Sequence, residues 1–353
     1  MSLSASIMRS LEDLLIVLSG EHDTLPAAEV KAILEAEGVE AEVLEERRFI
    51  LRLKAPRDCC LRIAERASMV MGCYLELFKC PAEEDAVVET ASRVDWSFLS
   101  GRSFAVRLLR KGGCKTGAST VRLEALIGGV AKRGSEGSKV DLRRPEVAVK
   151  GVIVDGQLYL GVARAEVSRG VFDERRPRRR PFFHPSALEP KLARLFVNLA
   201  RARKGDLLFD PFAGTGSILM EAALIGCSPV GVDVDAEMVR GCTANLRHYT
   251  PHAPGAVRGD ARRPPIRRAD CIATDPPYGR VSSTRGEELD RLLSDSLTSC
   301  SDLIPRGRCI CLATPSWLSL AEEAEDLGLK AVEEHLLRVH KSLSRRIIVL
   351  RRP

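Results

Sequence analysis

The chain has 353 residues, of which 45% are hydrophobic and 29% charged, so it can bury the cores of two or three domains. Its net charge of +6 divides into −7 over residues 1–50 and therefore +13 over the rest, which favours a polyanionic partner. Eleven scattered cysteines and no run of 18 apolar residues argue against a disulfide-rich secreted protein and a membrane span, and favour a reduced, cytoplasmic setting.

The first 81 residues alternate between strand-like and helix-like segments. An apolar run over 14–18 predicts a buried strand, and Pro26 and Gly38 mark the beginning and end of a helix. The segments that follow are strands over 39–44 and 48–53, a helix over 58–69 and a strand over 74–78. This β-α-β-β-α-β order predicts an N-terminal ferredoxin-like domain over 1–81.

A second α+β region is expected over 82–165. A strand beginning at Phe104, a helix over 121–130 and two strands flanking Asp155-Gly156 make up its pattern. Asp-Gly suits a type I′ turn, which needs positive φ at both central positions, so these two strands form a hairpin. Several basic residues dot the region, and the candidate contacts to a polyanion among them are Arg107, Lys111 and Arg143. A solvated charged face is the alternative interpretation.

A basic linker is expected over 166–183, because its charges and prolines are unsuited to a packed core. Its guanidinium groups can fork onto phosphate oxygens, and the arginines expected to contact phosphate are Arg176, Arg178, Arg179 and Arg180. The alternative is a solvated hinge.

Residues 184–353 alternate strands with helices, which predicts a mostly parallel α/β sheet. Apolar residues at helical spacing from Leu192 begin the series, and a strand at Leu207 and a helix ending at Gly226 follow. Two further strand-like runs near the end, around 335–340 and 346–350, predict an antiparallel C-terminal hairpin.

The first chemical signal is the segment Asp210-Pro-Phe-Ala-Gly-Thr-Gly-Ser217, which lies between a strand and a helix. Its glycines allow the backbone to approach a ligand, and the helix N-terminus offers N–H donors to a carboxylate or a ribose. The spacing is neither G-x-G-x-x-G nor G-x-x-x-x-G-K-[ST], so it does not favour a dinucleotide or a nucleoside triphosphate.

Two acidic residues follow the next strands. Asp233 ends the second strand, where a ribose hydroxyl pair is held in nucleotide-binding sheets, whereas Asp235 suits a helix N-cap. Asp260, followed by Ala261, precedes the third strand region and could accept from an adenine amino group. A plain turn is the alternative for that pair.

The strongest signal is Asp275-Pro276-Pro277-Tyr278-Gly279, directly after a buried strand. The two prolines make a rigid turn that preorganises the Asp275 carboxylate and the Pro276 carbonyl as acceptors. A base amino group is a poor nucleophile because its lone pair is delocalised into the ring. Two acceptors on its hydrogens favour a pyramidal nitrogen that can attack a sulfonium methyl group, and Tyr278 could stack on the extruded base.

These motifs, in this order, resemble those of the class I amino-methyltransferases. Phe183-His184-Pro185-Ser186, His248-Tyr249 and Asp275-Pro-Pro-Tyr-Gly-Arg280 more closely resemble the archaeal tRNA (guanine-10-N2) dimethyltransferases. Phe104-Ala-Val-Arg and Lys139-Val-Asp-Leu resemble the THUMP domain of that family. The resemblance covers nearly the whole chain, and it departs from the family at Ala213 and Ser217, where relatives commonly have Cys and Gly.

The resemblance implies a fold and a set of roles. The fold is a Rossmann-like class I methyltransferase domain over 184–353, preceded by the ferredoxin-like domain and by a THUMP RNA-binding domain over 82–165. Catalysis would fall to Asp275, Pro276 and Tyr278. S-adenosylmethionine would be bound by His184, Pro185, Ser186, Asp210, Ala213, Gly214, Gly216, Asp233, Asp260 and Ala261, with the first three closing over its methionine end.

By the same resemblance the THUMP region would bind the acceptor end of tRNA and the enzyme would be a monomer without a metal. Arg280 could contact the phosphate beside the flipped base, or could belong to an ordinary loop. Two alternatives remain: action on another tRNA guanine or on ribosomal RNA, and a non-catalytic tRNA-binding protein. Adenine-N6 DNA methyltransferases share the D-P-P-Y motif, but the THUMP-like first half favours RNA over DNA. The residues alone do not decide between one methyl group and two.

Overall fold

The computed structural model describes residues 11–113, 118–168, 170–277, 289–340 and 343–353. Tyr278 and Arg280 therefore lie outside the described residues. The chain divides into two compact units. The first takes in residues up to Ala27 together with Val39–Glu65 and Val70–Val167, and the second takes in Ala28–Gly38, Arg66–Met69 and Ser168–Pro353. Among the helices of the described ranges, none is long and apolar enough to cross a membrane.

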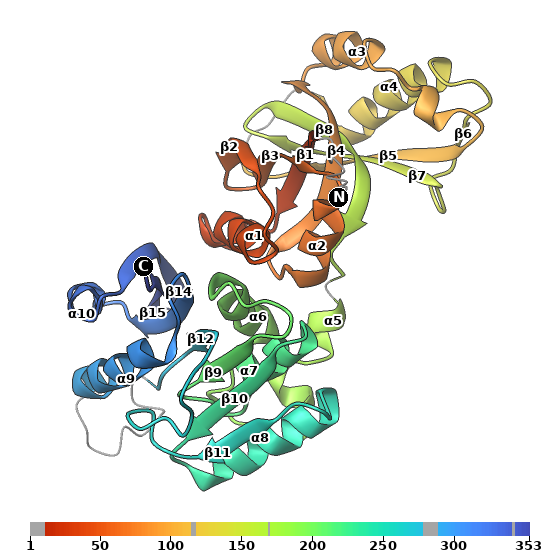
Figure 1. Ribbon diagram of the computed structural model, residues 1–353. Coiled ribbons are helices and arrows are strands. Elements are labelled where there is room, and N and C mark those ends of the chain that lie inside the picture. The colour runs from red at the N-terminus through yellow and green to blue at the C-terminus, as the bar shows by residue number, and fades with distance from the viewer. Residues whose placement is uncertain (1–10, 114–117, 169, 278–288, 341–342) are drawn as a thin grey trace, which may run out of the picture. The chain divides into compact units, whose positions relative to one another are not determined.

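The first unit is built on one eight-stranded sheet, seen in red to yellow-green in Figure 1. Its elements are β1 (Leu11–Leu18), α1 (Leu25–Ala36), β2 (Glu42–Arg47), β3 (Ile50–Pro56), α2 (Cys59–Arg66), β4 (Val70–Pro81), α3 (Glu84–Ser92), η1 (Ser97–Leu99), β5 (Ser103–Arg110), α4 (Thr120–Arg133), β6 (Lys139–Val140), β7 (Val147–Val154) and β8 (Gln157–Glu166). The predicted β-α-β-β-α-β order of the first 81 residues is confirmed, with α1 extending from the first unit into the second.

The strand order is β2-β3-β1-β4-β8-β7-β5-β6, and β4 pairs with both β1 and β8. The two regions expected on either side of residue 81 therefore share a single sheet through β4. The predicted hairpin of β7 and β8 turns at Asp155 and Gly156, whose φ angles are 49° and 77°. This is the positive-φ pair that the Asp-Gly turn requires.

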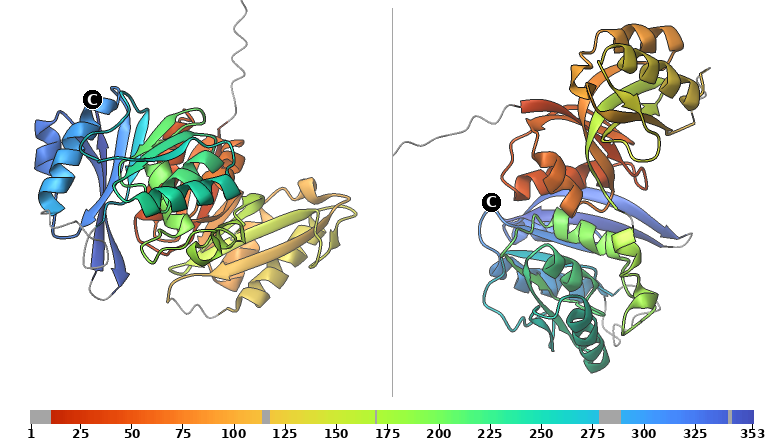
Figure 2. Two further views of the ribbon diagram at one scale, coloured as in Figure 1. Left: turned by 90° about the horizontal axis from the view of Figure 1, so that it is seen from below. Right: turned by 90° about the vertical axis from the view of Figure 1, so that its right-hand side faces the viewer.

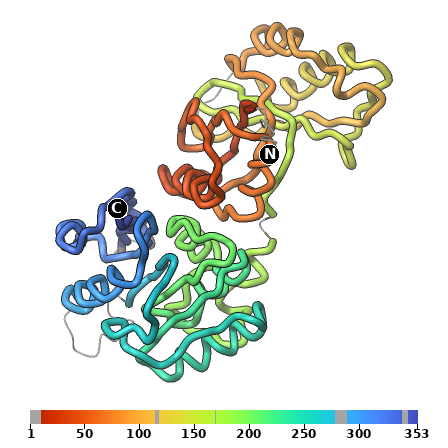
Figure 3. The backbone as a smooth tube through the Cα atoms, in the orientation of Figure 1, coloured from red at the N-terminus to blue at the C-terminus, as the bar shows by residue number. Residues whose placement is uncertain are grey.

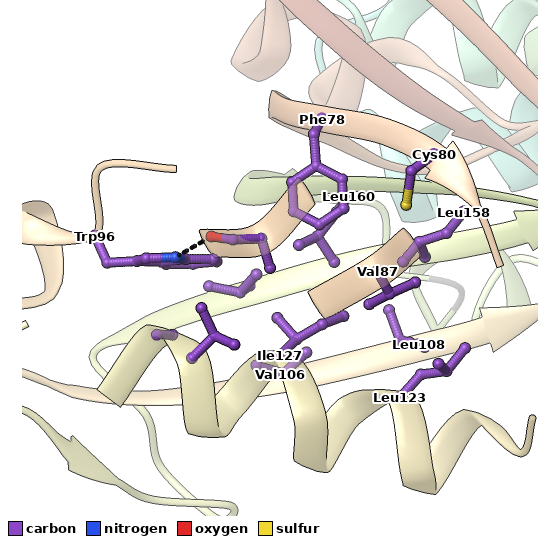
Figure 4. Close-up of a cluster of buried hydrophobic side chains, with 14 of the residues drawn as sticks. Phe78, Cys80, Val87, Trp96, Val106, Leu108, Leu123, Ile127, Leu158 and Leu160 are labelled. Atoms are coloured by element: carbon purple, nitrogen blue, oxygen red, sulfur yellow. Dashed lines mark hydrogen bonds between the residues drawn. The ribbon is translucent and has the colours of Figure 1, made fainter. Parts of the chain in front are cut away.

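Apolar side chains from one face of the sheet and from α3 and α4 meet in a core of the first unit (Figure 4). Trp96 is 2% exposed, and its indole N–H donates to the carbonyl of Ala91 at 2.9 Å. Ser119 begins α4 as an N-cap that accepts from the amide of Arg122. Cys60 and Cys73 form a disulfide, a pairing that the sequence left undecided.

The second unit is a mixed α/β layer structure on a seven-stranded sheet of order β11-β10-β9-β12-β13-β15-β14. Its elements are α5 (Gly170–Asp173), η2 (Pro177–Arg179), α6 (Pro190–Leu199), β9 (Leu207–Asp210), α7 (Ser217–Leu224), β10 (Ser228–Asp233), α8 (Ala236–Tyr249), β11 (Gly255–Arg258), β12 (Cys271–Thr274), α9 (Leu289–Leu303), β13 (Cys309–Pro315), α10 (Ala321–Asp326), β14 (Lys330–His340) and β15 (Leu343–Arg351).

Strands β9 to β13 are parallel. In the C-terminal hairpin, β15 is antiparallel to β13, and β14 is antiparallel to β15. This long hairpin lies at one edge of the sheet and is drawn in blue in Figure 2. The predicted parallel sheet with an antiparallel C-terminal hairpin is confirmed. Because β10 and β12 lie on opposite sides of β9, the strand order reverses at the carboxyl end of β9, where ligands bind in open α/β sheets.

The segment over 166–183 is more than a linker, because it packs onto the second unit. Figure 3 traces it in light green as it leads into α6. Phe172 and Pro177 are buried, and the Arg175 guanidinium pairs with Glu221, whose side chain is 1% exposed. The basic character of the segment did not prevent packing, because the buried carboxylate of Glu221 partners Arg175.

Candidate active site

Three carboxylates follow the ends of neighbouring parallel strands. Asp210 ends β9, Asp233 ends β10 and Asp275 comes directly after β12. Since parallel strands present their carboxyl ends at one edge, the sheet brings these three predicted residues together at the point of reversed strand order. The pKa of Asp210 is raised in part by the charges of Asp275 and Asp233, which reflects how near they lie.

Two residues of the glycine loop have backbone φ angles in the left-handed region. Gly214 has φ 50° and Gly216 has φ 83°. A side chain on Gly216 would meet the sulfur of Cys242 at 2.6 Å, whereas only one atom lies within 4 Å of the corresponding position on Gly214. Gly216 is the N-cap of α7 and contributes no side-chain cap. The loop thus presents backbone that a ligand can approach closely, as the sequence predicted.

Asp233 organises this loop. Its two carboxylate oxygens accept from the amides of Gly214 and Asp235, both at 2.9 Å. Asp235 in turn is the N-cap of α8 and accepts from the amide of Glu237. The distinction made from the sequence, with Asp235 as the helix cap, is confirmed.

Asp210 is 1% exposed and lies beneath the loop. Its Oδ1 accepts from the Phe212 amide at 3.0 Å and from the Thr274 hydroxyl at 2.6 Å. Burial is the main cause that raises the pKa of Asp210 to about 7. Through these two contacts the carboxyl joins the glycine loop to the last residue of β12, immediately before Asp275.

Asp275 is the most accessible catalytic candidate that the structure describes, with 12% of its side chain exposed. Its Oδ2 lies 3.3 Å from a guanidinium nitrogen of Arg345 on β15. Pro276, which follows it, is buried. The carboxylate is thus anchored at the strand end by a cation from a distant part of the chain.

The segment around His184 forms a turn next to the glycine loop. The His184 ring accepts from the Ser186 amide at 3.2 Å and lies 2.7 Å from the Ser186 hydroxyl, and Pro185 is exposed. Asn245, fully buried on α8, accepts from the Phe182 amide and donates to the carbonyls of Phe182 and Thr215. One side chain therefore ties this segment to the loop.

Asp260 makes a close ion pair with Arg262 at 2.7 Å and also accepts from the Arg262 amide. The Arg262 guanidinium is the main cause that lowers the pKa of Asp260. The carboxylate therefore stays charged and can accept a hydrogen bond. Ala261 beside it is buried, and the adenine role of this pair stays a prediction.

The basic strip divides into two kinds of arginine. Arg176, Arg178 and Arg179 are exposed, and the Arg178 guanidinium lies 5.7 Å from the ring centroid of Phe183. Arg180 is only 6% exposed and donates to the Ser217 hydroxyl and to the carbonyls of Leu188 and Arg175. The guanidinium of Arg180 is thus occupied inside the fold, unlike those of the three exposed arginines that share its predicted phosphate-binding role.

The two departures from the family pattern fit their surroundings. Ala213 is 5% exposed, and a side chain on Gly231 would meet its Cβ at 2.7 Å, so a small residue suits this position. The Ser217 hydroxyl accepts from Arg180 and donates to the carbonyl of Leu188 at 3.0 Å. The extra hydroxyl is therefore used to hold the preceding segment against α7.

The remaining predicted RNA contacts lie in the first unit. Arg107 on β5 donates to the carbonyls of Val106 and Leu142 and keeps 43% of its side chain exposed. Arg143 is exposed, and the Lys111 ammonium lies 5.9 Å from the Phe49 ring centroid. In the part of the chain that the structure describes, no cluster of three metal-ligating side chains occurs.

Sequence reasoning missed Thr274, Asn245 and Arg345. Their contacts join elements far apart in the chain, with 64 residues between Thr274 and Asp210. A signal existed for Asn245, because a polar residue beside Cys242 and Leu246 interrupts the apolar face of its helix. Such a residue needs a buried hydrogen-bonding partner.

The comparisons with known proteins agree with this geometry. Residues 177–347 match the family model described as RMKL-like, methyltransferase domain. The chain is 37% identical to a tRNA (guanine(10)-N2)-dimethyltransferase of Methanothermobacter thermautotrophicus, over 96% of this chain and 99% of that one. It is 30% identical to the protein of the same name from Methanocaldococcus jannaschii, over 95% and 99%. The crystal structure of TrmN from Thermus thermophilus shares the fold, with TM-score 0.55, 22% identity and coverage of 97% and 100%.

Proposed function

Because this chain belongs to the tRNA (guanine(10)-N2)-dimethyltransferase family, we propose that it transfers methyl groups from S-adenosylmethionine to the exocyclic N2 atom of guanine 10 of tRNA. Two transfers to the same nitrogen give N2,N2-dimethylguanosine. The observation that carries the proposal is the placement of Asp275 and Pro276 after β12, one strand from the glycine loop that follows β9.

The backbone of the glycine loop and the charges of the nearby carboxylates suit S-adenosylmethionine. When bound, the cofactor supplies a methyl group activated by a positively charged sulfur. Gly214 offers backbone that a ligand can approach, and Asp233, whose carboxylate accepts from the Gly214 amide, would hold the ribose hydroxyls. The carboxylates of Asp233 and Asp275 at the same edge suit a cationic ligand, since opposite charges attract more strongly in a partly buried site.

Asp275 and Pro276 would act on the substrate amine. The carboxylate and the Pro276 carbonyl accept the two hydrogens of the guanine N2, which localises the nitrogen lone pair and aims it at the methyl group. Methyl transfer leaves the nitrogen positively charged, and a carboxylate held beside it stabilises that charge as it develops. One of the two amine protons is then lost to restore the neutral base. Tyr278 remains the residue expected to stack on the flipped base.

The tRNA would be bound by basic residues of both units. In the first unit these are Arg107, Lys111 and Arg143, on the region expected to be a THUMP domain that recognises the acceptor end. In the second unit the exposed Arg176, Arg178 and Arg179 would contact phosphates, with Arg280 close to the flipped base. We further propose that the enzyme acts as a monomer in the cytoplasm.

Nucleoside mass spectrometry tests this function directly. The purified protein is incubated with S-adenosylmethionine and an unmodified tRNA transcript, and in parallel with the same transcript carrying adenine at position 10. We expect N2-methyl- and N2,N2-dimethylguanosine from the first transcript only. Methylated guanosine from both transcripts would retain the chemistry and refute the position. No methylated nucleoside from either would favour ribosomal RNA or a binding-only role.

A further inference from the structure

An arginine from the end of the chain contacts the catalytic carboxylate. The Arg345 guanidinium on β15 lies 3.3 Å from Oδ2 of Asp275, and the two side chains are only 15% and 12% exposed. An ion pair this well buried has a more fixed geometry than a surface pair and is less screened by salt.

The sheet explains how residues so far apart meet. β13 lies between β12 and β15, and Pro315, the last residue of β13, is in register with Arg345. The two outer strands are therefore about two strand spacings, or about 10 Å, apart. The long arginine side chain crosses this distance at the point where β13 ends. The C-terminal hairpin thus supplies a cation to the carboxyl edge of the parallel strands.

Electrostatics also favour the ion pair of Arg345 and Asp275. Asp275 lies near Asp210 and Asp233, and the charges of both raise the pKa of Asp210. Like charges at one edge disfavour each other, whereas a neighbouring guanidinium favours an ionised carboxylate. A guanidinium held beside one carboxylate oxygen also limits rotation of the whole group, so the direction of its lone pairs becomes fixed.

We propose that Arg345 is a positioning residue for methyl transfer: it fixes the orientation of the Asp275 carboxylate so that this group meets the amino hydrogen of the target guanine. The inference rests on the proposed function. Arg345 acts through Asp275 and not through cofactor or tRNA affinity. Its contribution therefore appears in the rate of the methyl-transfer step and depends on the presence of the Asp275 carboxylate.

The next residue on the strand offers a matched control. Arg346 forms an ion pair with Glu334 on β14 and donates to the carbonyl of Ser316 at 2.9 Å. Neighbouring residues on a strand point to opposite faces. Replacing Arg346 by Met removes the same charge and hydrogen-bond donors from the same hairpin but leaves the pair of Arg345 and Asp275 in place.

The experiment compares wild type with Arg345→Met, Arg345→Lys and Arg346→Met in single-turnover methylation, with separate measurements of S-adenosylmethionine and tRNA affinity. We expect Arg345→Met to lower the single-turnover rate about tenfold to a hundredfold, with both affinities within about twofold of wild type. Arg345→Lys should recover part of the rate, and Arg346→Met should stay within about threefold. Circular dichroism melts verify that each variant is folded.

A double-mutant cycle keeps the inference falsifiable if the single variants lose stability. In an Asp275→Asn background, Arg345→Met should cause little further loss of rate, because the group that it orients is gone. Equal losses in both backgrounds, or an unchanged rate in Arg345→Met, would overturn the proposal. So would a faster Arg345→Met, which would mean that the arginine competes with the guanine. The wild-type reaction on the guanine-10 transcript reports separately on the proposed function.

Discussion

Asp210 and Asp275 follow adjacent strands of one sheet, yet they have different environments. Asp210 is 1% exposed, accepts from a hydroxyl and an amide, and has its pKa raised to about 7. Asp275 is 12% exposed and lies beside a guanidinium. The first works as an internal brace between loop and strand. The second has the setting of a charged acceptor that faces a substrate, so location at the carboxyl edge does not by itself define a role.

Removing the Asp275 carboxylate is the strongest test of this difference between Asp210 and Asp275. Asp275→Ala should lower the rate of methyl transfer at least about a hundredfold, corresponding to about 3 kcal/mol of transition-state stabilisation. Affinity for tRNA should change little. Asp270→Ala is the control, because Asp270 lies just before the amino end of β12 and accepts from the amide of Leu207. If Asp275→Ala keeps its activity, or loses tRNA binding instead, the acceptor role is wrong.

The carboxylate after β10 should act on cofactor affinity. Asp233→Ala should weaken S-adenosylmethionine binding about tenfold to a hundredfold in calorimetry, since it removes a charged acceptor for the ribose and a partner of the loop amide. Asp235→Ala, which removes the N-cap of α8, should cost about 1 kcal/mol of stability with little change in affinity. If both variants lose the same affinity for S-adenosylmethionine, the loss comes from disturbed folding of the loop, and the ribose-binding role of Asp233 is wrong.

The basic strip allows a similar contrast between surface and interior. Replacing Arg176, Arg178 and Arg179 together by Ala should weaken tRNA binding about tenfold and reduce the slope of log K against log salt by up to about 3. Arg180→Ala should leave that slope unchanged and lower the melting temperature, because Arg180 holds Ser217 and Leu188. An unaltered slope in the triple variant would identify the strip as a solvated surface.

The pH dependence of folding stability should show a smaller effect that is specific to Asp210. A carboxyl group whose pKa is raised on folding costs nothing below its unfolded pKa of about 4 and destabilises the folded state progressively as pH rises through 7. Asp210→Asn has no such dependence and can still accept from Phe212 and Thr274. Between pH 5 and pH 8 the stability of wild type should fall relative to the variant by about 2 kcal/mol. Parallel melting curves over that range would show that Asp210 does not titrate there.

Local patterns were sufficient to predict the strands, the glycine loop and the carboxylates after β9, β10 and β12. Each of these depends on short-range rules such as strand burial, positive φ at glycine and rigid proline turns. The N-cap role of Asp235 was predictable for the same reason.

Contacts between distant elements were not predictable. The pairing of β4 with β8, the disulfide of Cys60 and Cys73 and the approach of Arg345 to Asp275 are set by strand order and register. The interior position of Arg180 depends on acceptors contributed by Ser217 and Leu188. A single sequence does not specify such tertiary partners. All four arginines of the basic strip were therefore given the same role, although Arg180 is buried and the other three are exposed.

The central claim is that this site methylates the exocyclic amino group of one tRNA guanine. The most direct test is a tRNA in which guanine 10 is replaced by inosine, which differs from guanosine only by lacking that amino group. Methyl transfer from labelled S-adenosylmethionine should be complete with the guanine-10 tRNA and absent with the inosine-10 tRNA, while the two tRNAs bind with similar affinity. Methylation of the inosine-10 tRNA at an equal rate would contradict the account.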